Sequence, residues 1–281
     1  MSDTQNARRP ILVTGATSGI GLELAALLAR EGFRVFGGAL PGEDSSDLDK
    51  TGATRVALDV TDRRSLEAAR KEIEEQLGEL PLWGLVNNAG VVDAGPVELL
   101  DLDHARQLFE VNVLGVMAAT QTFLPAIRAA KGRIVNMSSI SAILPLPFLG
   151  PYSASKSAVE TLSDSLRREL HPFGVDVVIV QPGTTRTPLW KKADQIDIAP
   201  FRGSPYEAAV EEVQRRAVRK GGKGMPPEQV AQAILEALRS ERPPSRVRVQ
   251  RKRKARIRYT LLPLVPDRIV DRLVAKEVWG E

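Results

Sequence analysis

The most constraining feature of the sequence is its first apolar run, residues 11–13, which leads through a glycine-rich turn into a long helical pattern. The turn carries Gly15, Gly19 and Gly21, and the helical segment LELAALLAREG follows at once and ends at Gly32. A buried strand, such a turn and a helix form the first half of a β-α-β unit. Glycines let the backbone approach a pyrophosphate without a clashing Cβ, and the helix N-terminus supplies free N–H groups. The opening therefore predicts a dinucleotide-binding sheet.

The residues after this helix bear on the choice of cofactor. The glycine spacing is Gly-x-x-x-Gly-x-Gly rather than Gly-x-Gly-x-x-Gly, and a second strand is expected over residues 34–40. At the end of that strand, NAD sites place an Asp or Glu on the adenosine ribose, and NADP sites place an Arg on the 2′-phosphate. Ala39 and Leu40 stand there instead, and no basic residue lies within the glycine-rich turn. The missing base favours NAD, and NADP stays open.

Strand and helix patterns alternate along the rest of the chain. We expect further strands over residues 54–60, 83–86, 133–137, 175–180 and 246–249. Apolar spacing predicts helices over residues 62–78, over 101–131 with Asp103 as cap, from 151 onward, over 226–239, and over 259–279 with breaks at two prolines. This alternation predicts an α/β fold, a doubly wound parallel sheet with helices on both faces. Because no linker interrupts the chain, we expect a single domain over residues 1–281.

Cysteine and long apolar segments are both missing from the sequence. With no cysteine, the chain has no disulfide, no thiolate metal site and no cysteine nucleophile, and no metal site is predicted. The first ten residues are polar, and the apolar run after them is far too short for a signal-peptide core. Prolines break the longest apolar stretches well below the roughly 20 residues of a spanning helix. We therefore expect a cytoplasmic protein that contacts membranes at most peripherally.

The net charge of +4 is unevenly distributed along the chain. Residues 246–258 contain eight basic residues and no acid, which leaves 31 basic against 35 acidic residues elsewhere. A basic segment can bind nucleic acid or anionic lipid, but no nucleic-acid motif accompanies it, and no nucleic-acid partner is predicted. A solvated helix face is the plainer interpretation. Leu261, Leu262, Leu264 and Val265, beside these cations, would suit a membrane surface, a pocket cover or a subunit contact.

Residues 132–160 contain the candidate reacting groups. Tyr152 and Lys156 lie four residues apart near the start of a predicted helix, which places the phenol and the ammonium on one face. A free tyrosine has a pKa of about 10, and a shift of roughly three units, partly caused by Lys156, would make it a working acid or base near neutrality. Ser139 precedes Tyr152 by thirteen residues and could bind the same substrate oxygen. The alternative is a serine-rich loop joined to a helix that happens to carry Tyr and Lys.

Asparagines and one aspartate complete the candidate site. The sequence Asn87-Asn88-Ala89-Gly90 follows the fourth strand, at the sheet edge where ligands lie. Asp59 follows the third strand, where it could accept a hydrogen bond from an adenine amino group. Asn112 stands between two valines, which fits either a satisfied buried amide or a link in a proton relay.

These motifs together resemble one known family. Thr14-Gly15-x-x-x-Gly19-Ile20-Gly21, the Asn-Asn-Ala-Gly segment, Asn112, Ser139, Tyr152-x-x-x-Lys156 and Pro182-Gly183 occur in the order found in short-chain dehydrogenases/reductases. The resemblance covers about residues 10–240. The segments FRVFGGAL, WGLVNNAG and FLPAIRAAKGRIVNMSS are further similar to the branch that holds retinol, hydroxysteroid and 3-hydroxybutyrate dehydrogenases.

The resemblance implies a Rossmann-like fold and an NAD(P)-dependent enzyme. Tyr152 would be the general acid/base, Ser139 would polarise the substrate oxygen, Lys156 would bind the nicotinamide ribose and lower the tyrosine pKa, and Asn112 would hold a water in a relay. Cofactor contacts are implied for Gly15, Thr17, Ser18, Gly19, Ile20, Gly21, Ala39, Leu40, Asp59, Val60, Asn88, Ala89, Gly90, Tyr152, Lys156, Pro182, Gly183, Thr185 and Thr187.

The substrate is expected to be a hydrophobic secondary alcohol or ketone, steroid-like or retinoid-like. Residues 189–224 occupy the position of the family's substrate lid, and residues 245–281 form a basic extension. The pocket would be lined by Leu144, Leu146, Phe148, Leu149 and Trp190. Two alternatives stay open, an NADP-dependent carbonyl or 3-oxoacyl reductase and a cofactor-sensing binding protein. The resemblance also implies a homodimer or homotetramer.

Overall fold

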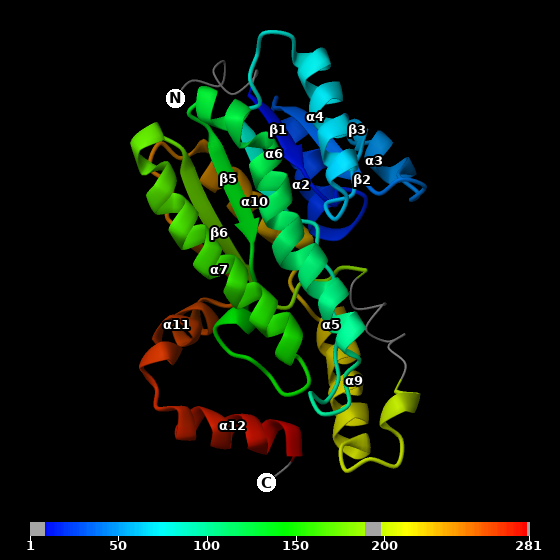
Figure 1. Ribbon diagram of the computed structural model, residues 1–281. Helices are drawn as coiled ribbons and strands as arrows, with labels where there is room; N and C mark the ends of the chain where they lie inside the picture. Colours follow the sequence, from blue (N-terminus) through cyan, green and yellow to red (C-terminus); the bar gives the residue numbers. More distant parts are fainter. Residues whose placement is uncertain (1–8, 189–197, 280–281) are drawn as a thin grey trace.

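A parallel sheet forms the centre of the molecule. The computed structural model describes residues 9–188 and 198–279 (Figure 1). Within these residues the sheet has seven strands, all pairing in parallel, in the order β3-β2-β1-β4-β5-β6-β7. The strands are β1 Pro10–Val13, β2 Arg34–Ala39, β3 Thr54–Ala57, β4 Gly84–Asn87, β5 Arg133–Met137, β6 Asp176–Pro182 and β7 Arg246–Val249. The predicted doubly wound fold is confirmed.

Helices cover both faces of this sheet (Figure 1). They are α2 Gly19–Arg30, α3 Ser46–Asp49, α4 Arg63–Leu77, α5 Leu102–Phe109, α6 Gly115–Ala129, α7 Gly150–Leu170, α9 Glu207–Gly222, α10 Pro227–Arg239, α11 Arg253–Leu261 and α12 Asp267–Trp279. α2 and α10 pack on one face, whereas α4 and α6 pack on the other. The five inner strands are therefore buried on both sides, which explains why they appear in the sequence as mostly apolar runs.

Alternate residues of one strand belong to different cores. Ile11 and Val13 pack with Leu24 of α2, while Leu12 between them packs with Leu66 of α4. All five side chains are fully buried. Because side chains alternate across a strand, β1 joins the two layers and fixes the turn that follows it.

The predicted strand limits differ most from the structure at the ends of β3 and β6. The third strand was expected to run to residue 60 but ends at Ala57. It pairs only with β2, whose last residue, Ala39, is the partner of Ala57. Beyond Ala57 there is therefore no neighbouring strand for it to pair with. The sixth strand, by contrast, continues past residue 180 to Pro182, because β7 pairs with it as far as Val249.

The predicted helix over residues 101–131 is also different in detail. A π-helical turn, Glu110–Leu114, separates α5 from α6. The cap is Asp101 rather than Asp103, since the Asp101 carboxylate accepts the Asp103 N–H at 2.8 Å. A π turn inserts an extra residue into a helix and is frequent at functional sites. Here it contains Asn112.

The C-terminal segment extends beyond the sheet. α11 begins at Arg253, six residues before the predicted start, and a short 3₁₀ turn, Leu262–Leu264, separates it from α12. α12 runs across the end of the molecule and packs against α9 (Figure 1). Among the described residues, no helix combines the length and apolarity needed to cross a membrane.

Candidate active site

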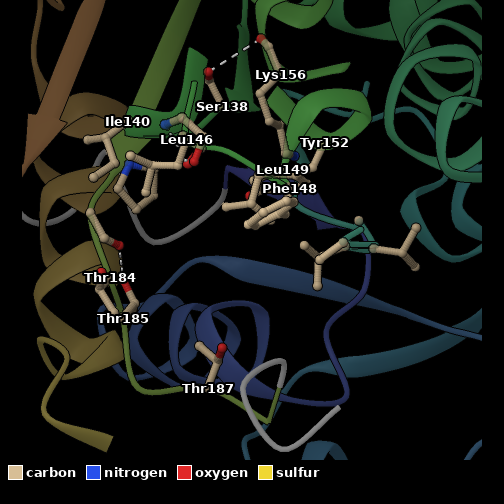
Figure 2. A pocket seen from close by; sticks show the side chains of 18 of the residues that line it. Ser138, Ile140, Leu146, Phe148, Leu149, Tyr152, Lys156, Thr184, Thr185 and Thr187 are labelled. Atoms are coloured by element: carbon tan, nitrogen blue, oxygen red, sulfur yellow. Dashed lines mark hydrogen bonds between the residues drawn. The ribbon is translucent and has the colours of Figure 1, made fainter. Parts of the chain in front are cut away.

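A cavity of about 280 Å³ opens at the carboxyl ends of the strands, where the strand order reverses between β1 and β4 (Figure 2). Such switch points bind ligands in open α/β sheets. The cavity brings together residues from the glycine-rich turn, the segment after β4, the end of β5 and the loop after it, α7, the loop after β6, and α9. Those predicted from sequence are Ile20, Asn88, Gly90, Ser139, Leu146, Phe148, Leu149, Tyr152, Lys156, Pro182, Gly183, Thr185 and Thr187.

Tyr152 and Lys156 project into the cavity from the first turns of α7, as their spacing predicts. The ammonium nitrogen lies 5.8 Å from the centroid of the phenol ring and donates to the Met137 carbonyl at 3.0 Å. Ser139 caps a short 3₁₀ turn, Ile140–Ala142, and its hydroxyl is a hydrogen-bond partner of the Tyr152 side chain. The structure thus joins three candidate reacting groups from the end of β5 and the start of α7.

Burial shifts the pKa values of both Tyr152 and Lys156. Loss of solvent raises the pKa of the Tyr152 phenol, and the hydrogen bond with Ser139 opposes this rise. Burial also lowers the pKa of Lys156 from 10.5 to about 8. The expected lowering of the tyrosine pKa by Lys156 is therefore not found in the protein alone, because desolvation is the larger effect on both groups.

The lowered pKa of Lys156 predicts a pH dependence of stability. An unfolded lysine keeps its proton to about pH 10.5, whereas folded Lys156 loses it near pH 8. Between these values the unfolded chain binds more protons, so the contribution of Lys156 to the free energy of unfolding rises with pH and is smallest below pH 8. From pH 8 to pH 10 we expect the wild type to gain about 2 kcal/mol relative to Lys156→Met. Urea unfolding of both proteins measures this gain, and a pH-independent difference would contradict it.

Asn112 is completely buried and reaches across to the segment after β4. Its Oδ1 accepts the Val91 N–H at 2.8 Å, and its Nδ2 donates to the Val91 carbonyl at 2.9 Å and to Ser155 Oγ at 3.1 Å. A Cβ placed on Gly90 would lie 3.1 Å from Asn112 Oδ1 and 3.5 Å from Lys156 Nζ. Asn112 is therefore a satisfied amide, and it also adjoins the lysine.

The glycine-rich turn has the shape of a cofactor cradle. Gly15 and Gly19 have φ angles of +62° and +56°, which disfavour other residues. A Cβ on Gly21 would lie 2.2 Å from the Gly15 carbonyl oxygen and 2.5 Å from Asn88 Nδ2. Asn88 fixes the turn by donating to the carbonyls of Thr14 and Gly15 at 3.0 and 2.9 Å. These residues fit a dinucleotide, because the backbone is free of side chains where α2 begins.

The remaining predicted cofactor residues lie along the same edge. Ala39 ends β2, Leu40 follows it, and Asp59 and Val60 follow β3, all outside the residues that line the cavity. Asp59 Oδ1 accepts the N–H and the hydroxyl of Thr61 at 2.9 and 2.7 Å. Thr17 and Ser18 precede α2, and Ala89 packs beside Gly15. On the other side, the methyl of Thr187 would lie 3.1 Å from a Cβ on Gly19, so the loop after β6 faces the glycine-rich turn.

The apolar end of the cavity differs partly from prediction. Leu144 does not line it and faces a second groove, and Trp190 lies outside the described residues. Helix α9 contributes Val210, Val213 and Gln214, which sequence reasoning placed in a lid without selecting them. The signal in the sequence was that Val213 and Gln214 follow Val210 by three and four residues, which places all three on one face of the predicted helix.

Sequence reasoning missed a polar network next to the site. Glu160 Oε1 accepts from Ser138 Oγ at 2.7 Å and from Gln181 Nε2 at 2.6 Å. Its Oε2 pairs with Arg246 Nε at 3.4 Å, and the same guanidinium pairs with Asp164 at 2.6 Å. The network ties the carboxyl ends of β5 and β6 and the first residue of β7 to α7, one turn beyond the lysine. The carboxylate four residues after Lys156 was its only local signal.

The fold and the site together define an α/β oxidoreductase that uses a nicotinamide cofactor. The family model described as short chain dehydrogenase matches residues 9–197. The chain therefore belongs to the short-chain dehydrogenase family, as its motifs predict.

Relatives of known name support the same class. An "NADPH-dependent 3-dehydrocapnine reductase" from Ornithobacterium rhinotracheale is 33% identical over 96% of this chain and 97% of that protein. A "17-beta-hydroxysteroid dehydrogenase type 6" from Bos taurus is 42% identical, over 66% of this chain and 60% of that protein. Other relatives are named retinol dehydrogenase and D-beta-hydroxybutyrate dehydrogenase, which confirms the predicted similarity to that branch.

Solved structures agree with the fold. A short-chain dehydrogenase from Streptomyces avermitilis has a TM-score of 0.76 at 30% identity, over 96% of this chain and 97% of that one. A short-chain dehydrogenase/reductase from Burkholderia phymatum, in complex with NAD, has a TM-score of 0.74 at 25% identity, over 91% and 94%. Another from Burkholderia cenocepacia, in complex with NADP, has a TM-score of 0.72 at 25% identity, over 94% and 97%.

Proposed function

We propose that this protein transfers a hydride between a nicotinamide cofactor and a hydrophobic secondary alcohol or ketone, with Tyr152 as the general acid/base. The observation that carries the proposal is the meeting of Tyr152, Ser139 and Lys156 in one cavity whose wall is otherwise mostly apolar. A phenol held beside a second hydroxyl can bind one substrate oxygen and exchange its proton. The apolar walls favour an uncharged carbon skeleton.

Each polar group has a distinct part in the proposed reaction. In the reducing direction, Tyr152 gives its phenolic proton to the substrate oxygen, while the Ser139 hydroxyl donates a hydrogen bond that holds this oxygen. Lys156 lies beside the phenol and carries positive charge at neutral pH, which stabilises the tyrosinate left behind. The glycine-rich turn and the loop ending at Thr187 would hold the dinucleotide. When bound, the nicotinamide supplies or accepts the hydride.

Asn112 is proposed as a positioning residue. Its hydrogen bonds to Val91 hold the segment after β4 against the π turn, and its neighbour in space, Gly90, faces the Lys156 ammonium. The relay implied by the family resemblance would pass a proton from Lys156 through a water held at this point.

The substrate class is proposed as steroid-like or retinoid-like, or as another apolar ketone. Steroid and retinol dehydrogenases among the relatives support the first, but the alignments cover 57 to 60% of those proteins. The relative aligned along nearly its whole length is named as an NADPH-dependent reductase, which favours a carbonyl reductase as the second candidate. A panel of steroids, retinoids, 3-oxoacyl thioesters and aliphatic ketones, assayed with both cofactors, tests the proposal. Absence of turnover across the whole panel would refute it.

Cofactor preference is a separate prediction. No basic residue stands at the end of β2 or within the glycine-rich turn, so a 2′-phosphate would lack its usual arginine there. We therefore expect NADH to bind more tightly than NADPH, by about tenfold, the effect of one missing charge-assisted hydrogen bond. Fluorescence titration of the protein with each reduced cofactor measures the ratio. Tighter binding of NADPH would contradict this expectation and favour the reductase alternative.

We also propose that the described chain acts as one domain that assembles into dimers or tetramers. Leu114 and Met117, near the start of α6, are exposed apolar side chains, as an uncovered subunit contact would require. Light scattering on the purified protein should give twice or four times the chain mass of 30.6 kDa. A mass equal to one chain would refute assembly.

Contact with an anionic membrane surface from the cytoplasmic side is proposed for the C-terminal segment. Leu264 and Leu273 are 80% and 64% exposed, and exposed cations, among them Lys252 and Lys254, lie on the same segment. Apolar and basic groups together favour binding to anionic lipid. We expect sedimentation with phosphatidylserine vesicles that weakens at high salt. Failure to sediment at low salt would contradict the proposal.

A further inference from the structure

A second groove lies beside the cavity, between the loop that follows β5 and the C-terminal helices. It has a volume of about 520 Å³. The loop contributes residues 143–147, and the C-terminal part contributes Leu262, Pro263, Val265, Asp267, Val270, Asp271, Val274, Ala275 and Trp279. Among these described lining residues only Asp267 and Asp271 ionise, and both are exposed. Most of the side chains that line the groove are therefore apolar.

Three side chains separate this groove from the cavity. Leu146 lines both spaces. Phe148 lines the cavity, and its ring lies edge-on to the Trp279 ring, which lines the groove, with 6.0 Å between centroids. Figure 2 shows Leu146, Phe148 and Leu149 on the cavity side, near Tyr152. The partition thus consists of side chains rather than of backbone.

The backbone at the partition is held in an unusual conformation. Phe148 has a φ of +68°, a left-handed value that an aromatic residue rarely adopts. Its carbonyl accepts the Gly95 N–H at 2.8 Å. Its ring also lies edge-on to the ring of Tyr206, just before α9, with 6.3 Å between the ring centroids. Strained residues are maintained where the surrounding structure determines them, and they cluster at ligand sites. Here the strain presents Phe148 at the junction of loop, lid and C-terminal helix.

We propose that the groove binds the distal part of an unbranched hydrocarbon chain whose oxygen-bearing carbon lies at Tyr152. The inference rests on the proposed function and narrows its substrate class to long-chain aliphatic ketones and alcohols. The cavity, at about 280 Å³, is at the small end of ligand pockets and must also receive the nicotinamide. A chain of more than a few carbons has to leave it. The groove beyond Leu146 offers an adjoining path lined mostly by apolar side chains, entered when Phe148 and Trp279 move apart.

A series of methyl ketones tests the proposal in the complete enzyme with its preferred reduced cofactor. From butan-2-one to dodecan-2-one, we expect kcat/KM to rise roughly two- to fourfold per methylene while each added carbon is buried. Val274→Trp places an indole in the groove and should lower kcat/KM for dodecan-2-one at least tenfold, with butan-2-one unchanged. The matched control is Leu273→Trp, because Leu273 is on the same helix but exposed and outside the groove.

The outcomes separate this inference from the proposed function. Equal effects of Val274→Trp on short and long ketones, or no effect on either, would overturn the groove while leaving carbonyl reduction in place. If no ketone is reduced, the proposed function fails for this class, and calorimetric titration of dodecan-2-one into wild type and variant then decides whether the groove binds the chain. Binding that the variant retains in full overturns the inference. Should Val274→Trp not fold, as judged by circular dichroism, Val270→Trp fills the same groove from the preceding turn.

Discussion

Replacing Tyr152 by phenylalanine should lower kcat by about a thousandfold, the usual contribution of a positioned general acid or base. The substitution removes only the phenolic oxygen, and the ring still packs beside Lys156 and the apolar wall. NADH affinity should therefore change by less than about threefold, since no hydrogen bond of the glycine-rich turn is altered. Steady-state kinetics with the best ketone of the panel, and a fluorescence titration with NADH, measure the two effects.

Tyr259→Phe is the matched control for this prediction. Tyr259 lies in α11, outside the residues that line the cavity, so its loss of a hydroxyl should leave kcat unchanged. Retention of activity in Tyr152→Phe would refute the mechanism. Loss of both activity and cofactor binding would indicate that the variant is misfolded at the site, and Ser139→Ala would then test the same oxygen-binding pair from its other member.

Replacing Gly21 by alanine should weaken cofactor binding by at least tenfold and destabilise the fold by about 1–3 kcal/mol, as overpacking does. The added Cβ would lie 2.2 Å from the Gly15 carbonyl oxygen, which belongs to the backbone and cannot rotate away. Relief requires the turn to move, and the turn is tied to Asn88. Titration with NADH and urea unfolding at one pH measure both effects.

Gly222→Ala provides the control for the glycine prediction. A Cβ at Gly222 would meet nothing within 4 Å, and the residue ends α9 on the surface. We expect unchanged stability and unchanged cofactor affinity. If Gly21→Ala behaved like Gly222→Ala, the tight cradle inferred for the turn would be wrong.

The framework of the fold was predictable because it depends on local patterns. Continuous apolar runs such as residues 11–13 indicate strands buried on both faces, and the structure places that run in β1, in the interior of the sheet. The limits of α4 also agreed with the predicted residues 62–78, since Asp62 accepts the Arg64 N–H and Gly78 ends the helix. Limits that depend on a partner strand were less accurate, since the end of β3 is set by where β2 stops.

The candidate site was predictable in part for the same reason. Tyr152 and Lys156 are neighbours on one helix, so their spacing alone brings them together. The direction of their pKa shifts was not predictable, because desolvation depends on segments packed around them from elsewhere in the chain. The pair of hydrogen bonds between the Asn112 amide and the Val91 backbone likewise depends on a π turn, and no residue pattern in the sequence marks that turn.

By itself, the sequence determined the family, through motifs spread along the chain. It also determined the strands, the glycine-rich turn and the pair of reacting groups on α7, because each of these follows from residues within about one element of each other. The tertiary structure alone decided which side chains surround them. It joined Glu160 to three strand ends, and it placed Trp279 of the last helix against Phe148, 131 positions earlier in the chain. Contacts of that kind follow from how helices and loops pack across the carboxyl edge of the sheet, and packing between distant segments leaves no periodic trace in the sequence.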